Sequence, residues 1–430
     1  MTPGARVAAA IEVMADVDGR RRPAADALKD WGLSHRFAGS KDRAGVAALV
    51  YDALRRRASA AYVMDDPSPR GVLVGALKLA RGLSLEDAEA LFSGEGHAPA
   101  QLSAGERARY ADASLAGAPA PVAGDFPEWL EPSLRAAFGE RLVEETAALA
   151  ERAPLDLRVN TLKCAREKAL ASLNGLDPAP TPLSPLGLRI PFAPDGRAVS
   201  LSSEPDYLKG RVEIQDEGSQ LAALLCAARA GEQVLDLCAG GGGKTLALAA
   251  AMDNRGQIYA HDDDPRRLAP IHARLERAGV RNVQIRTPRR GADVLADLEG
   301  RCDLVLIDAP CTGIGAWRRN PDAKWRLRPG ALEQRILAQD ALLREARRFL
   351  KDGGRLAYVT CSLLREENED RVAAFLAAER GFAPVGAQDA AERAGLPGLA
   401  RFASTLGPGF RFSPAASGTD GFYAAILARG

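Results

Sequence analysis

Apolar residues recur at helical spacing through the first 120 residues, where strand-like alternation is nearly absent. This spacing predicts amphipathic helices packed into one small domain over residues 1–120. The expected helices span residues 5–17, 23–31, 42–64, 71–80, 84–92 and 104–115. Two runs of arginine, 20–22 and 55–57, lie on them, and either RNA contact or a solvated helix face accounts for these runs.

The pattern changes after residue 118. Residues 118–124, Ala-Pro-Ala-Pro-Val-Ala-Gly, have the composition of a linker, and 128–153 are expected to form one or two helices. A strand over 155–160, a helix over 165–174 and a strand over 186–191 then predict a small α+β subdomain. Together these segments form a second expected region, residues 125–209.

From residue 210 onward, strands and helices alternate regularly. Strands are expected at 212–215, 233–237, 257–261, 283–286, 304–307 and 355–359, and helices at 218–230, 246–252, 265–278, 331–350 and 367–378. This alternation predicts an α/β domain over 210–430 with a mainly parallel, doubly wound, Rossmann-like sheet. An antiparallel pair at 402–412 and 421–427 is expected to close the sheet. Ligands on such sheets bind at the carboxyl ends of the strands.

Composition narrows the range of functions. The chain has 430 residues, enough for two or three domains, and a net charge of only +1, so an RNA partner must be bound by local patches. Its six cysteines form no Cys-x-x-Cys pair, which argues against a zinc site or a disulfide framework and fits a reducing cytoplasm. Glu12 and Asp16 interrupt the first apolar run, so no signal peptide is expected. No stretch approaches about 18–20 uncharged apolar residues, so no membrane span is expected either.

Residues 234–245, Val-Leu-Asp-Leu-Cys-Ala-Gly-Gly-Gly-Gly-Lys-Thr, predict a strand, a bare turn and a helix start. Such a turn lets a ligand approach the backbone and the free N–H groups of the helix. A phosphate loop would need glycine at Cys238, and a dinucleotide loop would need glycine at Thr245. A loop for the amino-acid half of S-adenosylmethionine fits, with Asp236 as its acid, and a plain turn is the remaining alternative.

Polar and thiol side chains follow three of the expected strands. Asp262 suits the hydroxyls of a ribose, although an aspartate here can also cap the helix that starts at Pro265. Cys311 and Cys361 each follow a different strand, in the segments 308–313 and 360–362. Thiols at this edge are candidate nucleophiles, whereas apolar packing is the expectation for Cys164, Cys226 and Cys302.

Residues 317–329, Trp-Arg-Arg-Asn-Pro-Asp-Ala-Lys-Trp-Arg-Leu-Arg-Pro, combine five cations and two tryptophans with one acid. Arginine pairs with phosphate and tryptophan stacks on bases. This composition predicts RNA binding, and the expected contacts are Arg318, Arg319, Lys324 and Arg326. The alternative is a surface loop fixed by its tryptophans.

From about residue 157 to its C-terminal end, the chain resembles the Sun/nucleolar-protein family of RNA cytosine-5 methyltransferases, which includes the bacterial small-subunit ribosomal RNA methyltransferases B. The resemblance rests on several separated motifs in the right order. They are Leu-Arg-Val-Asn-Thr-Leu-Lys at 157–163, Gln-Asp-Glu-Gly-Ser-Gln at 215–220, the turn at 238–245, 308–313, Arg-Asn-Pro-Asp-Ala-Lys-Trp at 319–325, 360–362 with 366–368, and 418–423. The N-terminal helices resemble the NusB-type RNA-binding domain of some members.

The resemblance implies a class I methyltransferase fold and a covalent reaction on cytosine. Cys361 would attack carbon-6, Asp308 would stabilise the adduct and Cys311 would help to release the product. The implied S-adenosylmethionine-binding residues are Asp236, Cys238, Ala239, Gly240, Gly241, Gly242, Gly243, Lys244, Asp262, Arg267, Asp293 and Asp308. Two positions depart from the family pattern. Gly240-Gly241 replace Ala-Pro, and the usual adenine-binding acid is missing, so that either Asp293 after a shift or backbone and apolar contacts would hold the adenine.

These observations predict an RNA cytosine-5 methyltransferase that is cytoplasmic and monomeric, without a metal or a membrane. Ribosomal RNA is the favoured substrate, and transfer RNA is open. A catalytically silent RNA-binding ribosome-assembly factor is one alternative. A nucleotide hydrolase that uses Gly243-Lys244-Thr245 is another, disfavoured by the missing first glycine.

Overall fold

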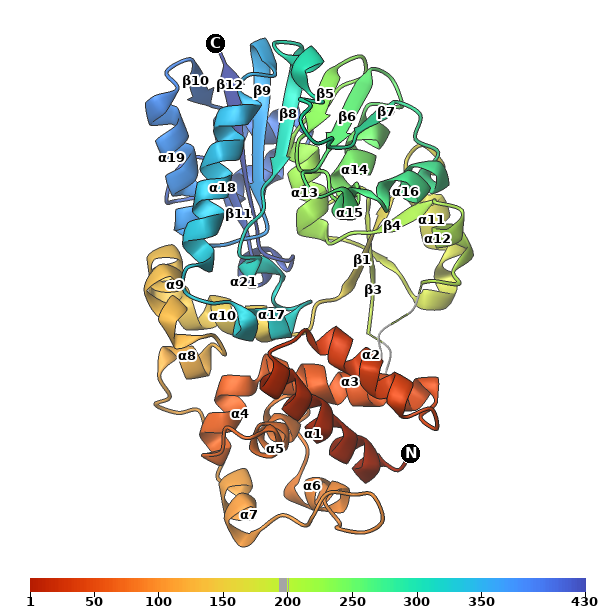
Figure 1. The fold of residues 1–430 in the computed structure, drawn as a ribbon, viewed down its shortest axis with the longest axis vertical. Helices are drawn as coiled ribbons and strands as arrows, with labels where there is room; N and C mark the ends of the chain where they lie inside the picture. Colours follow the sequence, from red (N-terminus) through yellow and green to blue (C-terminus); the bar gives the residue numbers. More distant parts are fainter. Residues whose placement is uncertain (193–198, 200) are drawn as a thin grey trace. The chain divides into compact units, whose positions relative to one another are not determined.

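The structure is a computed structural model that describes residues 1–192, 199 and 201–430 (Figure 1). The chain forms two compact units. One unit comprises Met1–Arg152 and Trp317–Pro329, and the other contains the remaining described residues. Across the described residues, no helix combines the length and the apolar character needed to cross a membrane.

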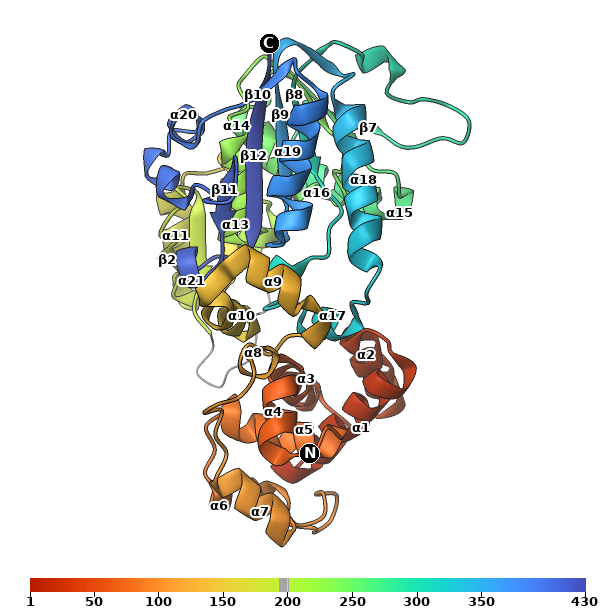
Figure 2. The same ribbon diagram turned by 90° about the vertical axis from the view of Figure 1, so that its left-hand side faces the viewer.

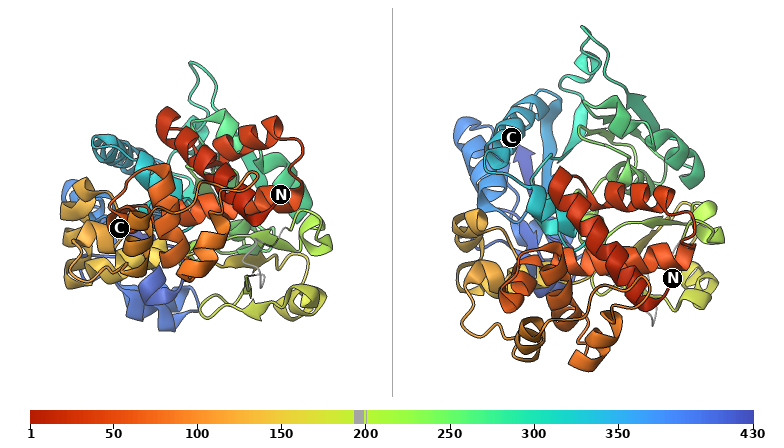
Figure 3. Two further views of the ribbon diagram at one scale, coloured as in Figure 1. Left: turned by 90° about the horizontal axis from the view of Figure 1, so that it is seen from below. Right: turned by 60° about the horizontal axis from the view of Figure 1, so that its bottom comes forward.

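The first unit is helical, as the apolar spacing predicts. Its core is formed by buried aliphatic side chains such as Val13, Val50 and Leu73, and α1 packs against α3 while α4 packs against α5. Figure 3 shows these helices, coloured red to orange, from below. The helices are α1 (Pro3–Arg20), α2 (Ala24–Ser34), α3 (Ser40–Arg55), α4 (Arg57–Met64), α5 (Pro69–Leu79), α6 (Leu85–Leu91), α7 (Ala104–Ala111), α8 (Ala120–Ala123), α9 (Glu131–Phe138), α10 (Leu142–Ala150) and, from far along the chain, α17 (Pro321–Arg326).

The single helix expected over 42–64 is wrong, because the structure divides it into α3 and α4 at Arg56, whose φ and ψ are −106° and 26°. The buried carboxylate of Asp125 starts the second helix. It accepts hydrogen bonds from the backbone N of Ser59 at 3.0 Å and from its hydroxyl at 2.7 Å. A side chain that satisfies free N–H groups at a helix start stabilises that start. The break therefore depends on a residue 66 positions away.

Two further segments, one expected as a linker and one as a single helix, differ from expectation at prolines. Residues 118–124, expected as a linker, include the helical turn α8 with Pro121 in its first turn. The helix expected over 265–278 is two helices, α15 (Pro265–Leu268) and α16 (Ile271–Ala278), separated by Ala269 and Pro270. Proline is tolerated at a helix start, but in a helix interior it removes a backbone donor.

The second unit begins with the small α+β subdomain. Its four strands are all antiparallel in the order β2-β3-β1-β4. Leu157, Leu188 and Val212 form part of its own core. Its elements are β1 (Leu155–Val159), α11 (Arg166–Ser172), β2 (Ala179–Pro180), β3 (Gly187–Ile190), α12 (Pro205–Leu208) and β4 (Val212–Ile214).

The large sheet of the second unit has the order β10-β12-β9-β8-β5-β6-β7, with β11 paired to β12. The strands β7, β6, β5, β8 and β9 are parallel, and β12 runs antiparallel to β9, β10 and β11. The expected closing pair is present as β11 and β12, but the first strand covers only the last three residues of the expected 402–412. The strands are β5 (Gln233–Asp236), β6 (Gln257–His261), β7 (Val283–Arg286), β8 (Cys302–Asp308), β9 (Leu350–Thr360), β10 (Phe382–Pro384), β11 (Phe410–Phe412) and β12 (Phe422–Arg429).

Helices cover both faces of this sheet. Val234 packs in the core that contains residues of α13 (Glu217–Leu225) and α14 (Gly243–Ala251), while the next residue, Leu235, packs in the core that contains residues of α18 (Ala331–Ala346) and α19 (Glu369–Ala378). Figure 2 shows these helix pairs on opposite sides of the strands. The expected fold class is confirmed, and the carboxyl ends of β5, β6, β8 and β9 meet at one edge of the sheet.

Candidate active site

The glycine turn between β5 and α14 has a backbone that side chains would obstruct. Gly240 and Gly242 have φ values of +50° and +81°, in the left-handed region that glycine tolerates. A Cβ on Gly242 would lie 2.5 Å from Cγ1 of Ile271. Arg274 fixes the turn from the other side by donating a hydrogen bond to the carbonyl of Gly241 at 2.6 Å. The turn therefore leaves bare backbone at the edge where ligands bind.

Asp236 ends β5 and is 1% exposed. Its Oδ2 accepts a hydrogen bond from the hydroxyl of Thr245 at 2.7 Å, while its Oδ1 has no partner among the described residues. Burial raises the pKa of this carboxyl to about 7. A buried oxygen without a donor is costly, so the site fits a ligand that brings a donor, such as the ammonium group of S-adenosylmethionine.

The aspartates after β6 divide two roles between them. Asp264 caps α15, since its carboxylate accepts the backbone N of Arg266 at 2.9 Å. Asp262 instead accepts the backbone N of Gly240 at 3.0 Å and lies 3.6 Å from the guanidinium of Arg267. Asp262 is therefore joined directly to the glycine turn, and its ribose-binding role stays a prediction.

Lys244 and Asp308 form an ion pair beside this turn. The distance from Nζ to Oδ2 is 2.6 Å, and the amine lies 5.1 Å from the centroid of the Phe422 ring. Burial acts to lower the pKa of Lys244, but the charge of Asp308 and its hydrogen bond outweigh burial, so that the pKa is raised. The lysine keeps its charge, and this charge stabilises anions nearby.

The two strand-end thiols lie together, with the sulfurs of Cys311 and Cys361 3.3 Å apart. The hydrogen bond between them raises the pKa of Cys311 well above its ordinary value, and burial adds to this rise. The same hydrogen bond lowers the pKa of Cys361, although burial and the charge of Asp308 oppose this change. The charge of Lys244 adds to the lowering. The pair therefore favours a thiolate on Cys361 and a donating thiol on Cys311.

A residue to which sequence reasoning gave no role, Glu367, holds the loop that carries Cys311. It is fully buried and accepts hydrogen bonds from the backbone N of Thr312 at 2.8 Å and from the amide of Gln339 at 3.1 Å. Its motif at 366–368 belongs to the resemblance and was the available signal. Thr245, the partner of Asp236, lies in the motif at 238–245, whereas Arg274, the partner of Gly241, carried no such signal.

Three other residues expected to bind the cofactor are Cys238 and Ala239, directly before the glycines of the turn, and Asp293, which follows β7. The thiol of Cys238 is half-buried, with its pKa raised by burial, and the backbone N of Ala239 donates to the carbonyl of His261 at 2.7 Å. Asp293 pairs with Arg348 at 2.5 Å and accepts the backbone N of Leu295 at 3.0 Å. Its adenine-binding role stays a prediction.

The segment 317–329 belongs to the helical unit and contains α17. Lys324 is 1% exposed and donates to the carbonyls of Arg55 at 3.1 Å and Asp125 at 2.6 Å. Burial lowers its pKa to about 7. Arg318 is also buried, whereas Arg319 is half-buried and Arg326 is exposed. The expectation of RNA contact is therefore corrected for Lys324 and Arg318, because neither side chain reaches the surface.

Most arginines of the two N-terminal clusters have acidic partners, as a solvated helix face would. Arg20 and Arg22 pair with Asp16, Arg56 pairs with Glu151, and Arg57 pairs with Asp18. The ion pairs of these four arginines therefore account for their positions in the helical unit without an RNA contact.

Two family profiles match the chain. The family described as 16S rRNA methyltransferase RsmB/F matches residues 223–428, and the RsmF/B-like ferredoxin-like domain matches residues 126–194. In solved structures, the fold is similar to that of PH0851, with a TM-score of 0.73 and 24% identity over 99% of both chains. NSun6 from Pyrococcus horikoshii, crystallised with SFG, has a TM-score of 0.59 and 24% identity over 71% of this chain and 98% of its own.

Relatives in two bacteria are named ribosomal RNA small subunit methyltransferase B. The protein of Sodalis glossinidius is 38% identical over 58% of this chain, but the chain spans only 57% of its length. The protein of Xanthomonas campestris is 32% identical over 90% of this chain and 89% of its own length. The family expected from the motifs is confirmed: the chain belongs to the Sun family, and the ribosomal RNA small subunit methyltransferases B are among its relatives.

Proposed function

We propose that the protein is an S-adenosylmethionine-dependent methyltransferase that methylates carbon-5 of a cytosine in ribosomal RNA. The observation that carries this proposal is the pair of sulfurs, 3.3 Å apart, next to the ion pair of Lys244 and Asp308. An aromatic carbon is a poor nucleophile, and a thiolate that adds to the ring removes this obstacle. The names of the relatives support ribosomal RNA as the substrate class.

The glycine turn supports the choice of cofactor. Bound S-adenosylmethionine supplies an electrophilic methyl group. The residues that would hold it are the turn itself, Asp236 with its unpartnered buried oxygen, and Asp262, which is joined to the turn through Gly240. Bare backbone at 240–243 and two acids suit a ligand that carries an ammonium group and ribose hydroxyls.

Each thiol has its own task in the proposed reaction. The Cys361 thiolate forms a bond to carbon-6 of the cytosine, which makes carbon-5 nucleophilic. After carbon-5 has been methylated, its proton leaves to solvent, the bond between carbon-6 and sulfur breaks, and the electron pair returns to Cys361. The Cys311 thiol donates its hydrogen bond to the sulfur as it leaves. Asp308, held by Lys244, stabilises the adduct at the base.

The base must leave its stack for the thiolate to reach carbon-6. Enzymes that perform chemistry on a base act on single-stranded or flipped nucleotides. We therefore expect an unpaired or flipped cytosine as the target. Bisulfite sequencing of ribosomal and transfer RNA from a strain that lacks the gene separates the two substrates, since only the true target loses its methylated cytosine.

The test uses cysteine variants with labelled S-adenosylmethionine and ribosomal RNA. Cys361→Ser should lower methyl transfer on the order of 10⁴-fold, as expected when a nucleophile is removed. Cys311→Ser should accumulate a protein–RNA adduct that survives a denaturing gel. The matched control is Cys164→Ser, a half-buried cysteine of the small subdomain, which should change neither readout.

Two results would contradict the proposal. Full activity of Cys361→Ser would reject the nucleophile. The absence of any methyl transfer in a single turnover of the unmodified protein would favour the silent assembly factor. Calorimetric titration separates the hydrolase alternative, because a phosphate loop would bind ATP and the proposed site would bind S-adenosylmethionine.

A further inference from the structure

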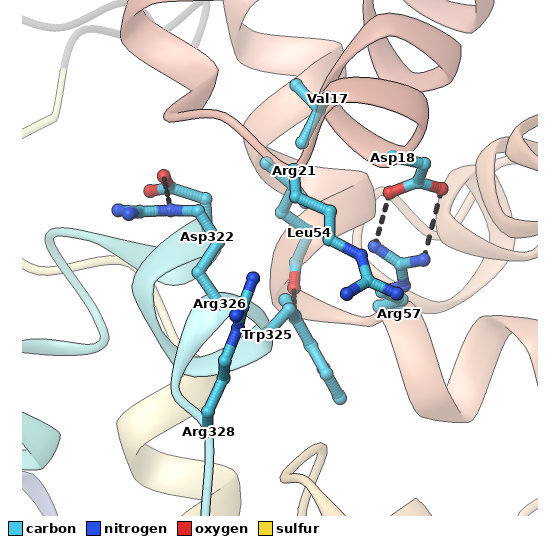
Figure 4. A pocket seen from close by; sticks show the side chains of 9 residues that line it. All are labelled: Val17, Asp18, Arg21, Leu54, Arg57, Asp322, Trp325, Arg326 and Arg328. Carbon is cyan, nitrogen blue, oxygen red and sulfur yellow. Dashed lines mark hydrogen bonds and ion pairs between the residues drawn. The ribbon is translucent and has the colours of Figure 1, made fainter. Parts of the chain in front are cut away.

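A pocket of about 450 Å³ lies within the helical unit (Figure 4). Its walls come from the end of α1, from α3 and α4, and from α17 with the residues after it. Four arginines line it, at positions 21, 57, 326 and 328, together with two acids, Asp18 and Asp322. The lining residues therefore carry two more positive than negative charges.

Both acids already have partners. Asp18 receives two hydrogen bonds from Arg57, at 2.6 and 3.0 Å. Asp322 accepts one from Nε of Arg326 at 3.1 Å and one from the backbone N of Ala24 at 3.2 Å. Within the described part of the chain, Arg21 and Arg328 have no acidic partner. The excess charge therefore belongs to two exposed guanidinium groups.

These two arginines come from distant parts of the sequence. Arg21 follows the last residue of α1 in a left-handed conformation, with a φ of +49°, and Arg328 follows α17. Glycine would adopt this left-handed conformation with less strain. The backbone of Arg21 is therefore strained where it holds the guanidinium group at the pocket. Like charges around one hollow repel one another unless an anion lies between them.

We propose that this pocket binds a nucleotide unit of the RNA substrate through its phosphate, an inference that rests on the proposed function. Guanidinium groups bind phosphate oxygens with two parallel hydrogen bonds, and the pairing of Arg326 to Asp322 through Nε leaves its other nitrogens for this purpose. The volume falls within the range of pockets for small organic ligands and is suited to a nucleotide. Such a contact positions RNA and carries no sequence information.

The experiment measures binding of a fluorescent ten-nucleotide oligouridylate to the full chain by anisotropy. This RNA contains no cytosine, so its binding does not depend on the methylation reaction. The double variant Arg21→Ala with Arg328→Ala should bind about 10-fold more weakly, and its plot of log affinity against log salt should be shallower by about 1–2. The matched control, Arg36→Ala with Lys41→Ala, removes two exposed charges from the same unit and should bind within about twofold of the unmodified protein.

Competition separates RNA from free phosphate as the source of the bound group. Inorganic phosphate and uridine monophosphate, each at about 1 mM, should leave the oligouridylate bound, because one phosphate forms only a fraction of the contacts. Equal losses in the two double variants, displacement by the monophosphate, or no binding by the unmodified protein would each overturn the inference. A protein that binds through Arg21 and Arg328 but never methylates cytosine would retain this inference and lose the proposed reaction.

Discussion

Two buried lysines, one in each unit, show that the neighbouring groups determine whether the pKa of a buried amine rises or falls. Lys244 lies beside the carboxylate of Asp308, and its pKa is raised. Lys324 donates to the carbonyl oxygens of Arg55 and Asp125 and lies over the Trp325 ring, and burial lowers its pKa to about 7. The first amine stays charged and acts on its surroundings, whereas the second joins parts of the helical unit. Burial of a cation therefore does not by itself indicate a functional site.

Among the variants that test this comparison, Lys244→Met should have the largest effect, because it leaves Asp308 without its cation. Removing one partner of a hydrogen-bonded charge pair costs about 2–5 kcal/mol, so we expect methyl transfer to fall by about 10²–10³-fold. The measurement is kcat with saturating ribosomal RNA. Lys244→Arg should recover part of the activity because it keeps the charge. If Lys324→Met lost as much activity, the contrast between the two lysines would fail.

A smaller effect, confined to the other unit, should follow Trp325→Ala. The Trp325 ring lies 5.0 Å from the Lys324 amine and packs against the helical core, and its Nε1 donates to the carbonyl of Leu54 at 2.7 Å. We expect a loss of about 3 kcal/mol in the stability of this unit, as for large core truncations. Hydrogen exchange should accelerate in α3 but not in β5 or β9. Trp325→Phe keeps a ring and should lose less, and equal acceleration in β5 would contradict the separation.

The smallest effect should appear in the pH dependence of the helical unit. An unfolded lysine has a pKa of about 10.4, and folding lowers that of Lys324 to about 7. Between these values the unfolded chain binds the proton that the folded chain has lost, so the free energy of unfolding rises with pH. From pH 7 to pH 8 we expect a gain of about 1 kcal/mol, measured by denaturant unfolding. Lys324→Met should remove this gain, and an unchanged slope would assign it to other groups.

The sequence alone predicts those parts of the molecule that depend on local pattern. β6 (Gln257–His261) and β7 (Val283–Arg286) have the expected bounds, because short apolar runs with clear breaks define them. The meeting of Cys311 and Cys361 also follows from order in the sequence, since both end parallel strands that are neighbours in the sheet. Position relative to a regular element is thus sufficient to predict that these two thiols lie together.

The features that the sequence does not predict are polar contacts between residues far apart in the chain. Lys324 contacts Asp125 across 199 residues, and Glu367 reaches Thr312 across 55. The composition of 317–329 suggested a surface loop or an RNA contact, because no local pattern shows that its lysine enters a helical core. Long-range polar pairing of this kind follows only from the packed fold.

The interleaving of segment 317–329 with the helical unit limits how this protein can be divided. The segment is connected in sequence to the loop of Cys311 on one side and to α18 on the other, yet its tryptophan and lysine are accommodated by residues of the first 152. A shortened chain that began after residue 152 would present a bare amine and an indole to water. Any graft of the methyltransferase portion onto another protein must therefore carry the helices with it or redesign these thirteen residues.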